Sequence, residues 1–485
     1  MTELDLIADL LKKGTALNEQ GSFDEALVVY HQIIKLNPDC AEAYYYLGIN
    51  LYQTKRFEES LYNFDQAIAI NPNHARTLCN RGIVLKDLKR FDEAIDTFNK
   101  AIAIESTTAV FYYNRGFVLQ KLNQLDKAVD DYEQAIKIKP DFVDPYINLG
   151  NIFRGYKQFN KAFANYEQAI TLNPNHADAH FNKSVLLLLI GNYDEGLVLY
   201  EWRWKQKHNI NYFRSYKKPL WLGSQSLTNK TLLIHMEQGL GDCIQFIRYA
   251  LLVQKLGVKV ILQVPTILIS IIATLKGHFI LVETGKLLPN FDYHCPVASL
   301  PLAFKTTVKS IPGELPYLYA IENYKKKWDK KLGKKTITRI GLVWAGNPDH
   351  VNDLNRSLLL KQFSSLLSLP FEFHSLQKDI REVDTQTLID LPHVYQHQDE
   401  LHDFSDTAAL IDAMDIIISV DTSVAHLAGA MGKRLWLLLP YLPDFRWMLD
   451  REDTPWYSSA KLYRQENINN WDDVLENLKV SLLKP

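Results

Sequence analysis

Prolines recur at intervals of 34 residues through the first part of the chain. Pro38, Pro72, Pro140 and Pro174 fit the interval, and Ser106 stands where the third member is due. Three further series keep this register, a glycine, a small-residue and an aromatic series: Gly14, Gly48, Gly82, Gly116 and Gly150; Ala26, Ser60, Ala94, Ala128 and Ala162; Tyr30, Phe64, Phe98, Tyr132, Tyr166 and Tyr200. A constant period of this length indicates stacked repeats rather than one globule.

The four series together resemble the tetratricopeptide repeat. Small residues let two helices approach, the aromatic residue fills the space between them, and proline ends the second helix. We expect six helical pairs from about Ala8 to Tyr200, the last degenerate, with His180, Ser184 and Gly196 at its marker positions. The predicted solenoid spans residues 1–205, and residues 206–229 form a cap and linker.

Composition narrows the class of protein. The chain has 485 residues, a net charge of −2 and no basic face, which argues against nucleic acid as a partner. Its four cysteines show no paired spacing, and the N-terminus lacks a signal-peptide pattern, so we expect a reduced, cytoplasmic protein. The apolar stretch from Val258 to Leu275 is interrupted by Lys259, Gln263 and Pro265, which argues against a membrane span.

From Lys230 onward, short apolar strands alternate with helical stretches. The expected strands are 231–236, 258–264, 279–282 and 292–297, then 339–344, 371–376, 416–420 and 435–439. Helices are expected at 243–256 and 424–431, and a charged helical linker begins at Tyr324. Two such runs predict two Rossmann-like halves, residues 230–325 and 335–485, with parallel sheets and a cleft between them.

Polar clusters follow several of these strands, where α/β folds bind ligands. Gly239 and Gly241 permit a tight turn and close approach of a ligand, and Asp242 beside them suits a general base. Asp242 could equally cap the following helix.

Asp421, Thr422 and Ser423 open a helix after the third strand of the second half, which predicts a diphosphate site because helix N-termini favour anions. His426 lies one turn further on. The alternatives are ordinary capping for the two hydroxyl residues and a packed polar side chain for His426.

Three more residues of the second half are candidates for the donor site. Asn347 and Arg356 belong to the polar loop after its first strand, where a cation would neutralise a phosphate. Gln377 ends the next strand and could meet a base or ribose. An Arg356 pair with Asp353 and a routine loop at Gln377 are the alternatives.

These motifs are similar to those of glycosyltransferase family 9, the ADP-heptose-type heptosyltransferases of the GT-B fold. The resemblance covers about residues 231–478 and is most specific at Asp421–Ala430; longer strings, including 239–246, 344–348 and 443–447, are similar to bacterial proteins that join tetratricopeptide repeats to such a region. It implies that Asp242 is the base, that Thr422, Ser423 and His426 contact the donor diphosphate, and that Arg356 meets phosphate.

The chain departs from this family in its first half, where the acceptor-binding insertions are not found. His294 lies outside the family's base motif but ends a strand near the expected cleft. It is a second candidate for the base or for orienting the acceptor, and a packed histidine is the alternative.

The repeats carry an asparagine at one register of four first helices: Asn80, Asn114, Asn148 and Asn182. Amides in a row can pair with the backbone of an extended peptide whatever its side chains are. A similar ladder and a similar architecture occur in the O-linked N-acetylglucosamine transferases. Local preference for asparagine at this position is the alternative.

Together these features predict an inverting glycosyltransferase that moves a sugar from a nucleotide-diphosphate donor to a protein hydroxyl. No Asp-x-Asp motif occurs in either half, so we expect no metal and no cofactor other than the nucleotide sugar as co-substrate. The repeats would hold the peptide and could also assemble copies of the chain. The rivals are a transferase that acts on a glycan or lipopolysaccharide acceptor and a repeat scaffold with an inactive transferase fold.

Overall fold

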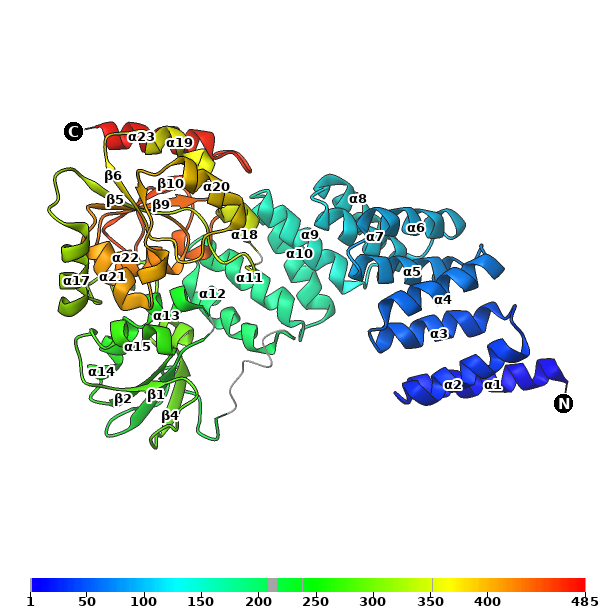
Figure 1. Ribbon diagram of the computed structural model, residues 1–485. Helices are drawn as coiled ribbons and strands as arrows, with labels where there is room; N and C mark the ends of the chain where they lie inside the picture. The colour runs from blue at the N-terminus through cyan, green and yellow to red at the C-terminus, as the bar shows by residue number, and fades with distance from the viewer. Residues whose placement is uncertain (1, 208–215, 238, 351, 485) are drawn as a thin grey trace. The chain divides into compact units, whose positions relative to one another are not determined.

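A computed structural model describes residues 2–207, 216–237, 239–350 and 352–484. The chain forms two compact units, Met1–Ala179 and His180–Pro485. The first unit is helical, and the second begins with the last repeat helices and continues as an α/β region (Figure 1). The boundary therefore falls inside the sixth repeat, about 25 residues earlier than the end of the expected solenoid at residue 205.

The expected helical repeats are confirmed. Their helices are α1 (Glu3–Glu19), α2 (Phe23–Leu36), α3 (Ala41–Gln53), α4 (Phe57–Ile70), α5 (Ala75–Asp87), α6 (Phe91–Ile104), α7 (Ala109–Lys121), α8 (Leu125–Ile138), α9 (Val143–Gly155), α10 (Phe159–Leu172), α11 (Ala177–Leu189) and α12 (Tyr193–Tyr200). The second helix of a pair ends two residues before the recurring proline, as α2 does before Pro38. Helix α6 ends at the same register although Ser106 replaces proline, so the proline is not required for the stop.

The glycine and aromatic series meet inside each helical pair. A Cβ atom at Gly82 would lie 2.6 Å from Cε1 of Phe98, and one at Gly48 would lie 2.7 Å from Phe64. Both aromatic rings are almost completely buried. Glycine is needed here because the ring of the second helix occupies the volume of a side chain on the first.

The first α/β half contains a four-stranded parallel sheet in the order β3-β2-β1-β4. Its strands are β1 (Thr231–His235), β2 (Lys259–Val264), β3 (Phe279–Glu283) and β4 (Tyr293–Pro296), with helices α13 (Leu240–Phe246), α14 (Tyr249–Gln254), α15 (Thr266–Ile272) and α16 (Leu300–Ala303). The helix expected at 243–256 is thus broken into two. Of the expected cap and linker, residues 208–215 lie outside the described part; Leu220 beyond them bridges to His294 in β4.

The second half contains a six-stranded parallel sheet in the order β10-β9-β8-β5-β6-β7. Its strands are β5 (Arg339–Val343), β6 (Glu372–Ser375), β7 (Val394–Tyr395), β8 (Ile416–Val420), β9 (Leu435–Leu439) and β10 (Ala460–Arg464). Its helices are α18 (Asp353–Arg356), α19 (Ser364–Leu367), α20 (Glu382–Asp390), α21 (Phe404–Asp412), α22 (Ser423–Ala430) and α23 (Asp472–Leu483). All eight expected strands are present, and β7 and β10 were not expected.

Counted within the second half, this order is 6-5-4-1-2-3, the order of a doubly wound dinucleotide-type sheet. The first sheet has the matching partial order 3-2-1-4. In such sheets the strand order reverses between the first and fourth strands, and ligands bind beyond the carboxyl ends of those strands. The reversal points are β1 with β4 in the first sheet and β5 with β8 in the second.

Helix α17 (Glu322–Leu332) connects the halves and confirms the expected charged helix. Its lysines are paired with acids of α21: Lys325 Nζ lies 2.9 Å from Asp412, and Lys327 Nζ lies 2.6 Å from Asp406. The basic run is therefore largely neutralised by its own fold. Across the described ranges, the helices are too short or too polar to span a bilayer.

Candidate functional site

Two turns that follow strands at the reversal points form the candidate site. One turn follows β1 and contains Gly239, Gly241 and Asp242 at the start of α13. The other follows β8, where Asp421 and Thr422 precede α22. Helices α13 and α22 pack against each other. The residues predicted from the two halves are thereby brought together.

The glycines of the first turn make room for side chains. A Cβ at Gly241 would come within 2.7 Å of Cδ2 of His426, and one at Gly239 within 2.5 Å of Oδ2 of Asp242. Both glycines therefore accommodate groups of the site itself. The sequence predicted close approach of a ligand at this turn, and the space at Gly241 is occupied by the His426 ring.

Asp242 forms an ion pair with Arg446, which lies 204 positions later in the chain. The buried guanidinium of Arg446 also donates to Asp444 Oδ1 and to Gln245 Oε1, each at 2.7 Å. Burial raises the pKa of the Asp242 carboxyl above its ordinary value, and Arg446 acts against this rise. Sequence reasoning gave Arg446 no role, although it stands in one of the strings, 443–447, that carried the family resemblance.

Arg356 reaches the second turn. Its Nη1 donates to the backbone oxygen of Asp421 at 2.9 Å. Its Nε is buried without a hydrogen-bond partner among the described residues, and it lies 4.0 Å from Asp353 Oδ1. Asp353 instead accepts a 2.7 Å bond from Arg381, a second cation that the sequence analysis missed. The simple local pair of Arg356 with Asp353 therefore does not describe this contact.

His426 is 5% exposed and is held by groups from several elements. Its Nδ1 lies 2.9 Å from the Tyr457 hydroxyl, and its Nε2 lies 3.7 Å from Asp421 Oδ1. Burial lowers the pKa of His426 well below its ordinary value. Burial, together with the nearby carboxylate of Asp444, raises the pKa of Asp421 to about 6.

Other predicted donor-site residues have structural partners. The Thr422 hydroxyl caps α22 by accepting from the Ala425 N–H at 3.4 Å, and Ser423 is the first residue of this helix. Gln377 is buried, and its amide group bonds both backbone polar atoms of Ala345, at 2.9 and 3.3 Å. Asn347 is exposed and accepts from the Asp349 N–H in its own loop. Of these residues, Gln377 positions backbone.

His294 lies in a separate cluster on the first sheet. Its Nδ1 is 3.2 Å from Nε2 of His235, and its ring is 4.8 Å from that of Tyr216. Its backbone pairs with Pro219 and Trp221 of the linker. None of the contacts described for His294 involves Asp242. This environment matches the packed-histidine alternative, and burial lowers the pKa of His294.

The asparagines of the repeats are not equivalent. Asn80 and Asn148 are partly exposed and donate to the hydroxyls of Tyr45 and Tyr132, at 3.4 and 3.2 Å. Asn114 is 7% exposed, and its amide donates to the Val110 carbonyl of its own helix at 2.8 Å. Asn182 lies in the second unit and is partly exposed. Only Asn114 has its amide turned into its own helix among the bonds described.

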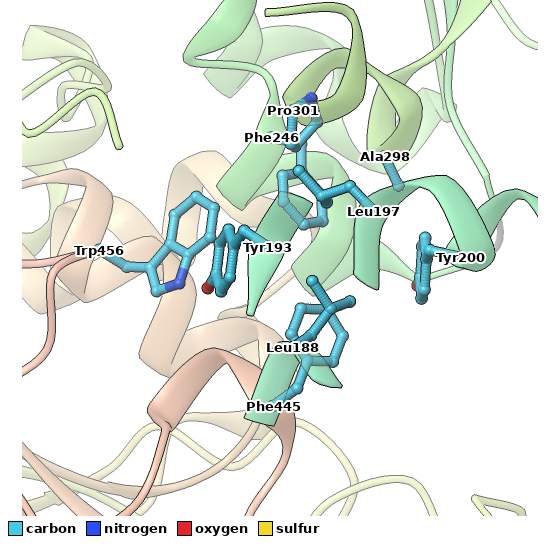
Figure 2. A pocket seen from close by; sticks show the side chains of 9 residues that line it. All are labelled: Leu188, Tyr193, Leu197, Tyr200, Phe246, Ala298, Pro301, Phe445 and Trp456. Atoms are coloured by element: carbon cyan, nitrogen blue, oxygen red, sulfur yellow. The ribbon is translucent and has the colours of Figure 1, made fainter. Parts of the chain in front are cut away.

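Figure 2 shows an apolar pocket of the second unit. It is lined by Leu188, Tyr193, Leu197, Tyr200, Phe246, Ala298, Pro301, Phe445 and Trp456. Tyr200 and Phe445 meet edge to face with ring centroids 5.7 Å apart. The lining comes from α11 and α12 on one side and from segments next to Asp242 and Arg446 on the other. The last repeat helices thus pack onto the segments that carry the candidate site.

Within the described ranges, no group of three or more histidine, cysteine or acidic side chains is arranged to hold a metal ion. The charged groups of the site instead pair with one another.

The repeat region matches models of the tetratricopeptide repeat at residues 14–54, 39–107, 109–142, 143–176 and 165–197. This confirms the repeat family for that part of the chain. The matches leave the region after residue 197 without a family.

A curated relative is protein FlbA of Caulobacter vibrioides, which is 22% identical over 327 residues. The match covers 62% of this chain and 54% of FlbA, so the chain spans about half the length of the relative. Because 62% of the chain exceeds the part that the repeats occupy, the similarity also includes residues beyond them.

Similar solved structures are repeat proteins. They include PilF of Pseudomonas aeruginosa (14% identity, TM-score 0.40, covering 43% of this chain and 97% of PilF) and MamA of Desulfovibrio magneticus (20%, 0.33, 36% and 98%). A third is YrrB, described as a repeat protein with an unusual peptide-binding site (19%, 0.33, 38% and 98%). Each covers less than half of this chain.

Proposed function

We propose that the second unit is an inverting glycosyltransferase that uses a nucleotide-diphosphate sugar and no metal ion. The observation that carries the proposal is the meeting of the two reversal-point turns, with Asp242 paired to Arg446 across them. Doubly wound sheets bind nucleotides at such points. The similarity of the motifs to glycosyltransferase family 9 supports the same reaction class.

In this proposal Asp242 is the general base that removes the proton of the acceptor hydroxyl. A base is most effective when its pKa lies near the working pH, and burial moves the pKa of Asp242 in that direction. Arg446 keeps the carboxylate oriented in the resting state. As the acceptor binds, the carboxylate would exchange part of this contact for the hydroxyl.

The departing diphosphate would be stabilised by fixed donors. Arg356 carries a buried Nε–H without a partner among the described residues, close to the start of α22. An N–H held in place in a buried site stabilises developing negative charge without reorganisation. His426 and the N-terminal end of α22 would complete this donor set.

The acceptor class is assigned to proteins. Tetratricopeptide repeats present one side chain at the same register on successive helices, and Asn80, Asn148 and Asn182 are partly exposed there. Exposed amides can pair with the backbone of an extended peptide. Transfer of labelled sugar only to glycans or lipids would contradict this assignment. A repeat scaffold without transferase activity is the second candidate, which the confirmed repeat family favours.

A panel of nucleoside diphosphates and nucleotide sugars, added to the full chain in a thermal-shift assay, tests the donor site. Ligand at 100 times its Kd stabilises a protein by about 2.7 kcal/mol, so one member should raise the melting temperature clearly. Failure of every nucleotide to shift it would leave the scaffold as the better function.

Arg356→Ala should then weaken binding of that nucleotide by about 10-fold or more, because a charge-assisted hydrogen bond contributes about 1.5–3 kcal/mol. Lys378→Ala is the matched control, since Lys378 is an exposed cation of the same half. Equal affinities of the two variants in calorimetry would remove Arg356 from the donor site.

A further inference from the structure

The ring of His426 has one orientation in the site. It lies nearly parallel to the indole of Trp447, with ring centroids 5.3 Å apart and an angle of 22°. Its other side meets the backbone at Gly241, where even a Cβ would come within 2.7 Å of Cδ2. A flipped or rotated ring would collide with one of these neighbours. Each ring nitrogen therefore faces a defined partner.

Nδ1 faces Tyr457. The two atoms are 2.9 Å apart, and Tyr457 is fully buried in the loop before β10. Its ring packs on the backbone of Gly429, where a Cβ would lie 2.5 Å from the ring. The guanidinium of Arg248 lies 4.8 Å from the same ring and donates to the backbone of Trp456. Tyr457 is therefore as firmly placed as His426.

The electrostatic surroundings keep His426 neutral. Three buried or partly buried cations act on it: Arg446 after β9, Arg248 before α14 and Arg356 of α18. The one acid in ion-pair range is Asp421, at 3.7 Å from Nε2. Burial and the three arginines all lower the pKa of His426. A neutral imidazole carries one proton, on either Nδ1 or Nε2.

The position of Asp421 decides between the two tautomers. With the proton on Nδ1, the Nε2 lone pair would face the Asp421 carboxylate across a buried 3.7 Å gap, which is repulsive. With the proton on Nε2, the N–H faces the carboxylate, and the Tyr457 hydroxyl donates to Nδ1. The second arrangement satisfies both ring nitrogens.

We propose that Tyr457 is a positioning residue that holds the His426 proton on Nε2, where the ring offers an N–H donor to the departing diphosphate. The identity of that anion rests on the proposed function, whereas the tautomer rests on the contacts of His426. Tyr457 itself does not touch the substrate in this scheme.

The tautomer is measured by long-range proton–nitrogen NMR on the full chain labelled with ¹⁵N-histidine, at pH 7.5. The chain has 14 histidines, and the signals lost in His426→Gln assign the residue. We expect the Nε2–H pattern in the wild-type protein. Tyr457→Phe preserves the ring and removes the hydroxyl, so the His426 pattern should shift toward the other tautomer. An Nδ1–H pattern in the wild type, or an unchanged pattern in Tyr457→Phe, overturns the inference.

Kinetics with the nucleotide sugar found by thermal shift provide the second readout. Tyr457→Phe should lower kcat by about 10-fold and leave the acceptor KM nearly unchanged, the effect of losing about one hydrogen bond in the transition state. Tyr463→Phe is the control, because the Tyr463 hydroxyl is buried without a hydrogen-bond partner among the described residues. Equal kcat values for the two variants would contradict a positioning role.

The two readouts separate the two proposals. If no nucleotide sugar is bound or turned over, the proposed function fails and the assignment of a diphosphate fails with it. The NMR result still decides whether Tyr457 fixes the proton of His426, since it needs no substrate.

Discussion

At the residue scale, Asp421 is held in a protonation balance that opposes folding at neutral pH. Its pKa in the folded protein is about 6, above the reference value of 3.8, because it is buried and lies near Asp444. For a raised carboxyl pKa, the stabilising contribution of the protonated form is complete below pH 3.8 and is lost as the pH rises through 6. Such a residue is expected where a function requires it.

We therefore expect Asp421→Asn to stabilise the protein at neutral pH. A shift of this size corresponds to about 2–3 kcal/mol, so the free energy of unfolding should exceed that of the wild type at pH 7.5. The gain should shrink between pH 6 and pH 4. Urea titrations at the three pH values measure it, and a gain that is independent of pH would contradict the assigned cause.

Asp242 predicts a kinetic effect instead. Asp242→Asn should lower turnover by roughly 100-fold or more and leave nucleotide affinity intact, because loss of a general base affects the chemical step. In the wild type, kcat/KM should fall with decreasing pH through an apparent pKa above the ordinary aspartate value, since burial raises the pKa of Asp242. Asp453→Asn, which changes an exposed carboxylate, is the control. Near wild-type turnover by Asp242→Asn would place the base elsewhere.

The sequence identified the residues of this site that stand in local motifs, and it missed those that arrive from afar. Asp242, Asp421 and His426 follow strand ends, which the hydrophobic pattern locates. Arg446 meets Asp242 across 204 positions, and no spacing rule relates them. Tyr457 stands in a loop whose only signal was its aromatic residues. The role of His294 failed to be separable for the same reason, because its partners His235 and Tyr216 come from two other segments.

At the element scale, the contact between glycine and ring sets the geometry of each repeat. Gly82→Ala should destabilise the protein by about 1–3 kcal/mol, because the added Cβ would lie 2.6 Å from the buried ring of Phe98. Gly155→Ala is the matched control: Gly155 also lies in a helix, and its Cβ would meet nothing within 4 Å. It should be neutral or stabilising by up to about 1 kcal/mol. Thermal unfolding followed by circular dichroism compares the two, and equal effects would contradict this packing argument.

The elements that sequence predicted best are those with strong periodicity or long apolar runs. The repeat helices follow from a period of 34 residues, and the central strands β8 and β9 were placed at their observed bounds. The two missed strands lie outside the apolar interior. Strand β7 has two residues, and β10 alternates apolar residues with Lys461 at the sheet edge. The break between α13 and α14 lies within a continuous apolar stretch, where periodicity carries no signal for it.

At the scale of the whole molecule, a buried ion network makes the last repeat helices part of the α/β unit. Arg203, 4% exposed, donates to both oxygens of Glu237 at 2.9 Å and to Glu201 at 2.6 Å, and it also bonds Ser299. Glu237 stands between β1 and the turn of Asp242. The network explains why the boundary of the compact units precedes the end of the repeats.

Arg203→Leu should therefore unfold the second unit more easily. It leaves two acids in a buried site without their cation, which typically costs about 3–5 kcal/mol. All nine tryptophans lie at or beyond Trp202, so tryptophan fluorescence in a urea titration reports on this unit. Lys335→Met, which removes a half-exposed ion pair with Asp415, should shift the transition by less than about 1 kcal/mol. Adding Glu201→Gln and Glu237→Gln to Arg203→Leu should recover much of the loss, because the uncompensated charges are then gone. If the triple variant were as unstable as Arg203→Leu alone, the loss would come from packing of the arginine side chain between Tyr200 and Trp204 rather than from its charge.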